Sequence, residues 1–147
     1  MAGKTNKFEY DLMRLVFNGV AITNWAATGG STSLWLGLHT ADPGDAASTA
    51  AEGGYSAYTR VKTDRSSVAS TGWSVSSGST AATVAPLTAI DFPQCTGTTG
   101  TFTHASVWPS SNAQASSAIY VGTLSPNVNF AEGVTPRITT GSSITEG

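Results

Sequence analysis

Charged residues are scarce in this chain of 147 residues. Lys, Arg, Asp and Glu make up 11% of it, against about 25% in ordinary globular proteins. Serine and threonine together outnumber them, so the surface must consist largely of hydroxyl, amide and backbone groups. Such a surface suits close packing against other proteins, because desolvating a hydroxyl costs far less than desolvating an ion. It also leaves strand edges poorly guarded by charge, which suits edges that partners cover.

The chain also lacks a basic cluster. Its net charge is −2, and its seven Lys and Arg residues are scattered. Nucleic-acid binding needs several phosphate-neutralising cations on one surface, so we expect no nucleic-acid partner. No run of roughly 18 apolar residues is present, and we expect no membrane partner. The first nine residues contain no apolar core of a signal peptide, which predicts synthesis in a cytoplasm without a cleaved export signal.

Residues for chemistry are equally few. The single Cys95 excludes an internal disulfide, and with His39 and His104 it makes at most three zinc ligands, without ligand-like spacing. Serine is abundant, but no Gly-x-Ser-x-Gly elbow marks one as a nucleophile, and no pair of carboxylates is indicated. A Ser-His-Asp arrangement stays open because serine is everywhere. We predict no catalytic, cofactor-binding or metal site, no cofactor, and no enzyme activity; His39 and Asp42 are interpreted as scaffold.

The clearest pattern that is present lies in residues 34–44. Three leucines at 34, 36 and 38 alternate with Trp35, Gly37 and His39. Side chains alternate along a strand, so the leucines share one face and Trp35 and His39 share the other. Burial of each leucine contributes roughly 1.5–3 kcal/mol. The following Asp42-Pro43-Gly44 predicts a turn that ends the strand. Asp45 to Gly54 has no pattern and predicts a surface loop that could reach a partner.

One helix is predicted near the start, over residues 7–17. Asn6 can cap it, and Glu9 has the spacing of a capping box. Asn18-Gly19 is a typical C-terminal stop. The predicted apolar stripe consists of Phe8, Leu12, Leu15 and Val16. The helix could cover one end of a β core, or it could be an arm that docks on a neighbouring subunit.

The remaining chain contains short β segments separated by Gly, Pro and Asn turns. They are predicted at residues 58–62, 73–76, in two pieces of 82–92, and at 101–108, 118–124, 134–140 and 143–145. About seven or eight such strands predict an all-β fold, a β-sandwich or jelly-roll-like domain with a short N-terminal helix. We divide the single domain into a helical segment, 1–19, and a β-sandwich, 20–147.

Four tryptophans allow two interpretations. Trp25, Trp35, Trp73 and Trp108 could form a platform on which sugars stack. Alternatively they fill a core or an interface, where tryptophan is enriched in any case.

Several segments, in this order, resemble a family of small tailed-bacteriophage virion proteins. The first two are His39 to Gly44 (HTADPG) and Glu52 to Arg60, with the pattern E-x-x-Y-x-x-Y-x-R. The resemblance continues in residues 90–93, 100–105, 119–124 and 138–145, and is lost from Ser66 to Thr83. Proteins of this kind are described both as head decoration (cement) proteins and as tail-fibre proteins, without a catalytic residue. The resemblance implies a bacteriophage structural protein with a small β-sandwich fold.

We therefore expect a capsid decoration protein that binds the outer head surface of the virion in many copies and stabilises the lattice. Its expected partners are the major capsid protein and further copies of itself, as a homo-oligomer. The alternative is a tail-fibre or adhesin module that binds a host surface glycan. The candidate interface residues are Phe8, Leu12, Trp35, Asp42, Pro43, Gly44 and Trp108.

Overall fold

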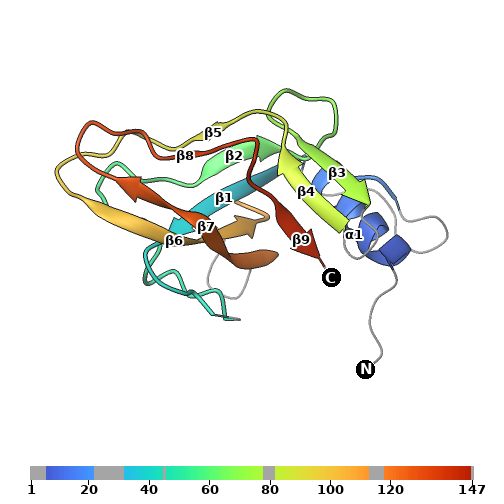
Figure 1. The fold of residues 1–147 in the computed structure, drawn as a ribbon, viewed down its shortest axis with the longest axis horizontal. Helices are drawn as coiled ribbons and strands as arrows, with labels where there is room; N and C mark the ends of the chain where they lie inside the picture. Colours follow the sequence, from blue (N-terminus) through green and yellow to red (C-terminus); the bar gives the residue numbers. More distant parts are fainter. Residues whose placement is uncertain (1–5, 22–31, 45, 78–81, 113–117, 147) are drawn as a thin grey trace. The chain divides into compact units, whose positions relative to one another are not determined.

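The computed structural model describes residues 6–21, 32–44, 46–77, 82–112 and 118–146. Figure 1 shows the helix and strands within these ranges. In chain order they are α1 (Asn6–Asn18), β1 (Ser33–His39), β2 (Val61–Asp64), β3 (Trp73–Ser77), β4 (Ala82–Pro86), β5 (Ile90–Asp91), β6 (Gly100–Trp108), β7 (Tyr120–Phe130), β8 (Arg137–Ile138) and β9 (Ile144–Glu146). The pairings β1–β6, β3–β4, β4–β9, β5–β8 and β6–β7 are antiparallel. The predicted all-β fold with a short N-terminal helix is confirmed.

The chain forms two compact units, each assembled from segments that are far apart in the sequence. Unit 1 takes Met1–Thr32, Asp64–Ala89 and Thr139–Gly147, and unit 2 takes Ser33–Thr63 and Ile90–Ile138. The division into a helical segment and a β-sandwich at residue 19 stays a prediction, and so does the sandwich or jelly-roll type.

Unit 1 packs α1 with the sheet β3-β4-β9. Met13 and Phe17 lie one helical turn apart and are fully buried, and the Phe17 ring meets Trp73 edge-on at 5.1 Å between centroids. The predicted helix is confirmed, but its buried stripe is different. Leu12, Leu15 and Val16 are only half-buried, and the Phe8 side chain lies outside the described residues. Packing against the sheet buries Met13 and Phe17 in place of the predicted stripe.

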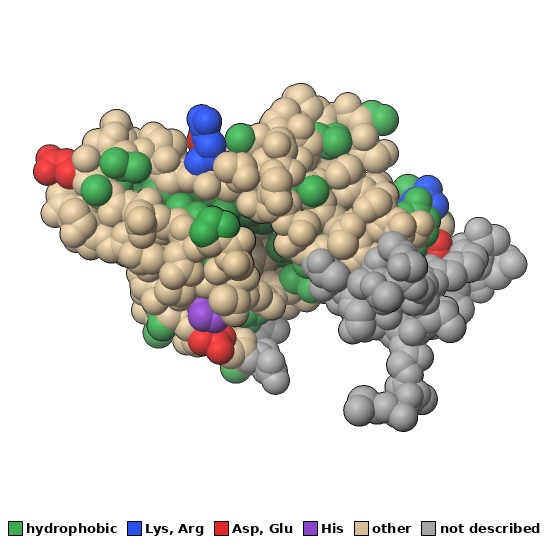
Figure 2. Space-filling model, viewed as in Figure 1, with side chains coloured by type: hydrophobic (Ala, Val, Ile, Leu, Met, Phe, Trp, Pro, Cys, Tyr) green, Lys and Arg blue, Asp and Glu red, His purple; other side chains and the backbone are tan. Residues whose placement is uncertain are grey.

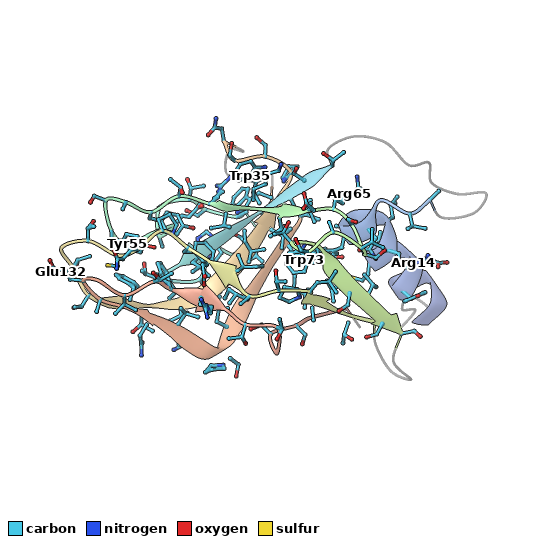
Figure 3. The ribbon with its side chains drawn as sticks, turned by 90° about the horizontal axis from the view of Figure 1, so that it is seen from above. Arg14, Trp35, Tyr55, Arg65, Trp73 and Glu132 are labelled. Carbon is cyan, nitrogen blue, oxygen red and sulfur yellow. The ribbon has the colours of Figure 1, made fainter. Side chains whose placement is uncertain are left out.

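Unit 2 contains the four-stranded sheet β2-β1-β6-β7 and the two-stranded sheet β5-β8. The predicted leucine face of β1 is confirmed: Leu34, Leu36 and Leu38 are at most 4% exposed. An aromatic cluster fills the interior of this unit, with neighbouring ring centroids 4.5–6.3 Å apart; it consists of Tyr55, Tyr58, Phe92, Phe102 and Phe130. Tyr55 is labelled in Figure 3.

The turn after β1 forms as predicted. The Gly44 N–H donates to the Asp42 carboxylate at 2.8 Å, and Gly44 has a φ of 63°, which glycine adopts without strain. The following loop does not reach outward over its whole length. Thr40 N–H donates to the Ala51 carbonyl and Gly53 N–H to the Leu38 carbonyl, both at 2.9 Å. The end of the loop is therefore held against the last residues of β1 by backbone hydrogen bonds. Asp45 lies outside the described residues.

The later strands differ from their predicted bounds. Residues 82–92 form two pieces, β4 and β5, as predicted. Residues 134–140 contain only the two-residue β8, and β7 runs from Tyr120 to Phe130, six residues beyond its predicted end. Hydrophobic alternation stops at Leu124, but β6 continues to pair with Val128, Asn129 and Phe130. Pairing with a neighbour extended the strand beyond its local pattern.

Candidate functional site

The two segments that carry the strongest sequence pattern meet in unit 2. Gly37 and His39 of β1 lie on the sheet face opposite the leucines, and in the register Gly37 faces Ser106 and Trp35 faces Trp108 on β6. The segment from Glu52 to Arg60 packs against this face. We call His39, Glu52, Arg60, Ser106 and Trp108 the buried polar cluster.

Glu52 and Arg60 form a bidentate ion pair. Arg60 donates from Nε to Glu52 Oε1 at 2.6 Å and from Nη2 to Oε2 at 2.7 Å. The two side chains are only 7% and 9% exposed. A fork-to-fork pair fixes both partners in geometry as well as in charge, which a lysine could not reproduce. The pair therefore ties both ends of the E-x-x-Y-x-x-Y-x-R segment together.

The same guanidinium group covers Trp108. Arg60 Cζ lies 3.6 Å from the centroid of the indole ring, close enough for a cation–π interaction. Arg60 Nη1 also points to the carbonyls of Ser110 and Ser111, at 3.4 and 3.5 Å. Arg60 thus connects the loop segment to the end of β6 and to the turn that follows it.

Ser106 lies at the centre of the cluster. Trp108 Nε1–H donates to Ser106 Oγ at 2.5 Å, and His39 Nε2 lies 2.7 Å from the same oxygen. His39 Nδ1 is buried without a hydrogen-bond partner among the described residues. Burial lowers the pKa of His39, with Arg60 and His104 lowering it further and Glu52 opposing them. The surroundings therefore favour the neutral imidazole, chiefly because burial removes the water that would stabilise its charged form.

Close packing of the cluster depends on Gly37. A Cβ at this position would lie 2.7 Å from Ser106 Oγ, 2.9 Å from Glu52 Oε1 and 3.0 Å from Trp108 Nε1. No side chain fits there without displacing these groups. The cluster therefore needs a residue without a side chain at position 37, which explains a glycine inside the strand.

The two tyrosines of the pattern also point inward. The Leu38 N–H donates to the Tyr58 hydroxyl at 2.7 Å, and that hydroxyl lies 3.4 Å from Glu52 Oε1. Burial raises the pKa of Tyr58 well above its usual value. The Tyr55 hydroxyl donates to the Pro93 carbonyl at 2.7 Å. Each fixed position of E-x-x-Y-x-x-Y-x-R therefore has a partner inside unit 2.

The chemistry open to the cluster is limited by access. A serine oxygen 2.7 Å from an imidazole nitrogen has the spacing of a nucleophile and its base. However, Ser106 is 1% exposed and His39 is 0% exposed, and the Trp108 N–H already occupies a lone pair of the serine oxygen. A substrate could not reach Ser106 without opening the unit. The geometry favours a structural role, holding the loop segment on the sheet.

A half-buried histidine lies beside His39 on the same sheet face. His104 pairs with His39 in the register, and its Nε2 lies 3.9 Å from an Asp42 oxygen and 3.3 Å from Thr123 Oγ1. Its Nδ1 lies 2.9 Å from Thr103 Oγ1. In the part of the chain that the structure describes, no group of three or more His, Cys, Asp or Glu residues could hold a metal ion.

The described candidate interface residues differ in how far they are exposed. In unit 2, Asp42 and Gly44 are exposed, Trp35 is half-buried, and Pro43 and Trp108 are buried. The 0% exposure of Trp108 leaves no ring surface for a partner, because Arg60 covers it. In unit 1, Leu12 is half-buried. The role of these residues in an interface stays a prediction.

Sequence reasoning missed Glu52, Arg60 and Ser106 as members of a site. The available signal for Glu52 and Arg60 was that two residues of opposite charge lie eight positions apart in a chain with few charges. Ser106 had no signal, because one serine among many is distinguished only by its position opposite Gly37.

Comparison with known protein families identifies the family of the chain. Residues 3–145 match the family model described as podophage GP4 fiber I protein gp80. The chain belongs to this fibre I protein family. Membership makes it a bacteriophage structural protein of the virion, as the sequence resemblance implied. A search of curated proteins found no match. Among the described residues of this fibre I family member, no helix is long and apolar enough to cross a membrane.

Proposed function

We propose that this chain is a fibre component of a podophage particle. One observation carries the proposal: the match to the fibre I family extends over residues 3–145 and so takes in α1, strands β1 to β8 and the first two residues of β9. The resemblance therefore covers segments of both units and is not confined to one motif. The proposed role is non-enzymatic, which the sealed geometry of Ser106 and His39 supports.

The surface supports a packing role within a particle. Charged side chains are few on the face that Figure 2 shows, and most of that face is coloured as other side chains or backbone. Hydroxyl-rich surfaces can be buried repeatedly against neighbours at low desolvation cost. A subunit of this kind is held by many small contacts, which add up through multivalency.

Capsid decoration is the second candidate. It is supported by the lack of a heptad repeat in the sequence, since long fibre shafts commonly use a trimeric coiled coil. In this arrangement the chain would bind the major capsid protein on the outer head surface and stabilise the assembled lattice, because it would bind the assembled state and not the separated subunits.

Glycan binding by a fibre finds no support in the tryptophans that the structure describes. Trp73 and Trp108 are at most 2% exposed, and Trp35 is half-buried. Trp25 lies outside the described residues. Among the described residues, an adhesin role would use other side chains, such as the exposed hydroxyls.

Immunogold electron microscopy of purified virions tests the proposal. Antibodies against this chain are expected to label discrete fibres, and quantitative mass spectrometry should give far fewer copies than the major capsid protein. Uniform labelling of the head at a copy number comparable to the major capsid protein would replace the fibre role with decoration. Absence of the chain from purified virions would contradict both.

A further inference from the structure

The hydrogen bonds at the centre of the buried polar cluster have a direction that follows from which atoms can donate. The Trp108 Nε1–H can only donate, so Ser106 Oγ accepts its hydrogen bond at 2.5 Å. Among the described residues, the Ser106 hydroxyl then has one acceptor within reach, His39 Nε2 at 2.7 Å. Ser106 therefore donates to His39, and the neutral imidazole carries its proton on Nδ1.

The other tautomer would leave more buried groups without a partner. With the proton on Nε2, His39 and Trp108 would both donate to Ser106 Oγ, and the serine hydrogen and the Nδ1 lone pair would both stay unpaired. With the proton on Nδ1, that N–H is the one polar group of these three side chains that lacks a partner among the described residues. A buried polar group without a hydrogen bond is costly, so the direction from Trp108 through Ser106 to His39 is favoured.

This arrangement requires a neutral His39. An imidazolium has two N–H donors and no acceptor, so Ser106 would lose the acceptor for its hydrogen and would receive two donors instead. Arg60 and His104 oppose a positive charge on His39, and Glu52 favours one. Protonation therefore reverses the hydrogen bond between His39 and Ser106 and adds a like charge near Arg60.

A charged His39 would also compete with Arg60 for Glu52. His39 and Glu52 form an isolated backbone bridge, and Arg60 holds the Glu52 carboxylate through two hydrogen bonds. The Tyr58 hydroxyl, 3.4 Å from Glu52 Oε1, stays neutral at ordinary pH because burial raises its pKa. Lys62 on β2, the other neighbour of β1, is exposed. One carboxylate would therefore face two cations, which weakens its hold on each.

Arg60 is the cation that can leave. Its Nη1 points to the carbonyls of Ser110 and Ser111, two exposed residues, so the guanidinium group already borders the surface. The middle of the segment from Glu52 to Arg60 is held separately, because its two tyrosines belong to the aromatic cluster.

We propose that the buried polar cluster is a pH-sensitive clasp, in which a proton taken up by His39 Nε2 releases Arg60 from the Trp108 ring while the aromatic cluster keeps the rest of the segment in place. The open clasp binds the proton more readily than the closed one, so acid shifts the equilibrium toward the open form. Opening uncovers the ring surface that Arg60 covers in the closed form. The inference goes beyond the proposed function, because it concerns the chain by itself and applies to a fibre and to a head lattice alike.

Solution NMR of the isotope-labelled, unmodified chain tests the proposal. At about pH 8 the His39 ring should carry its proton on Nδ1, as read from the signals of its two ring nitrogens. Between about pH 7 and about pH 5.5, the protection of the Arg60 Nε–H and the Trp108 Nε1–H against solvent exchange should fall about fivefold, within the roughly tenfold per pH unit that one proton allows. The Leu38 amide, which donates to the Tyr58 hydroxyl, should keep its protection.

Three results of this titration would overturn the proposal. The first is a proton on His39 Nε2 at about pH 8, and the second is unchanged protection of the Arg60 and Trp108 groups down to about pH 5. The third is an equal loss of protection at the Leu38 amide, which would mean that unit 2 opens as a whole.

Two histidine variants assign the effect to one residue. His39→Gln keeps an amide that can bond to Ser106 but cannot take up a proton, so the pH response of the Arg60 Nε–H should disappear. His104→Gln is the matched control, because His104 lies half-buried on the same sheet face, and it should retain the response. A response that survives His39→Gln, or that disappears in His104→Gln, would contradict the proposal.

Discussion

Glu52 and Arg60 are two charged residues that lie in the interior of a chain in which only 11% of the residues are charged. Their side chains are 7–9% exposed and satisfy each other through two hydrogen bonds. A buried pair of this kind contributes little beyond an apolar replacement, but breaking it leaves one charge without a partner. Substituting Glu52 or Arg60 alone should therefore lower the free energy of unfolding more than substituting both.

Glu52→Ala is expected to lower the free energy of unfolding by about 3–5 kcal/mol, because it strands Arg60 under the protein surface. The double variant Glu52→Met with Arg60→Met should lose less than either single variant. Urea unfolding of all the variants provides the measurement. Asp91→Ala is the matched control, since its partner Arg137 is exposed and the loss should be small. A double variant that is less stable than both singles would contradict the argument.

Gly37→Ala should be clearly destabilising, by about 1–3 kcal/mol, because its Cβ would lie 2.7 Å from Ser106 Oγ. Gly122→Ala, on the same sheet, meets no atom within 4 Å and should be nearly neutral. Thermal unfolding of the two variants compares them directly. Equal loss in both would mean that intrinsic glycine effects in strands, and not the polar cluster, decide the outcome.

His39 should make stability depend on pH in a defined direction. Its pKa is lowered in the folded chain, so below the ordinary value of 6.5 the unfolded state binds more protons than the folded state. Stability should therefore be nearly constant above about pH 7 and should fall as the pH falls below about 6.5 toward the lowered pKa. His39→Gln keeps a polar group near Ser106 but removes this titration, so its unfolding free energy should fall less over the same range. Parallel pH profiles for both proteins would exclude His39 as the cause.

At the scale of elements, the end of α1 is completed by a residue from elsewhere in the chain. Arg65 donates from Nε to the Val16 carbonyl at 2.5 Å and from Nη2 to the Leu15 carbonyl. Figure 3 shows Arg65 beside the helix. The last turn of α1 has no basic residue of its own, so Arg65 supplies both the hydrogen bonds and the charge that a helix C-terminus favours.

Arg65→Ala should fray the last turn of α1 and lower the stability of unit 1 by roughly 1–3 kcal/mol. Hydrogen exchange of the amides at the C-terminal end of α1 should accelerate. Arg14→Ala is the matched control, because the Arg14 guanidinium lies over the Tyr10 ring, with Cζ 5.4 Å from the ring centroid. If Arg14→Ala frays the helix equally, loss of general positive charge, and not the loss of these hydrogen bonds, would explain the result.

The elements differ in how far their sequence predicts them. The helix bounds and the leucine face of β1 follow from capping residues and from strict alternation, which are local signals. The buried face of α1 was predicted wrongly. The predicted stripe is apolar, but so are Met13 and Phe17, and the sequence alone does not show which of them packs inward. The contact of Phe17 with Trp73 selected between them.

At the scale of the whole molecule, stability rests on buried groups more than on surface charge. The net charge is −2 and 11% of the residues are charged, and those that matter most for packing, Glu52 and Arg60, are shielded from solvent. Salt screens exposed charges strongly and buried pairs much less. The chain is therefore built to keep its stability in changing ionic conditions.

Raising NaCl from about 50 mM to about 500 mM should shift the thermal midpoint by no more than about 2 °C. The measurement is differential scanning calorimetry at constant pH. Glu52→Ala should respond more strongly than the unmodified chain, since it leaves Arg60 unpaired. A large salt-dependent shift in the unmodified chain would show that surface ion pairs carry much of its stability.

The amino-acid sequence by itself determined the all-β class, the helix near the start, the leucine face, the turn at Asp42 to Gly44 and the likeness to bacteriophage virion proteins. These features depend on residues that are neighbours along the chain, so their signals survive without the fold. Only the tertiary structure decided that Glu52, Arg60, Ser106, His39 and Trp108 form one cluster, and that β7 continues to Phe130 as an edge strand. These features depend on the register between strands and on burial, which are set by contacts between residues far apart in the chain.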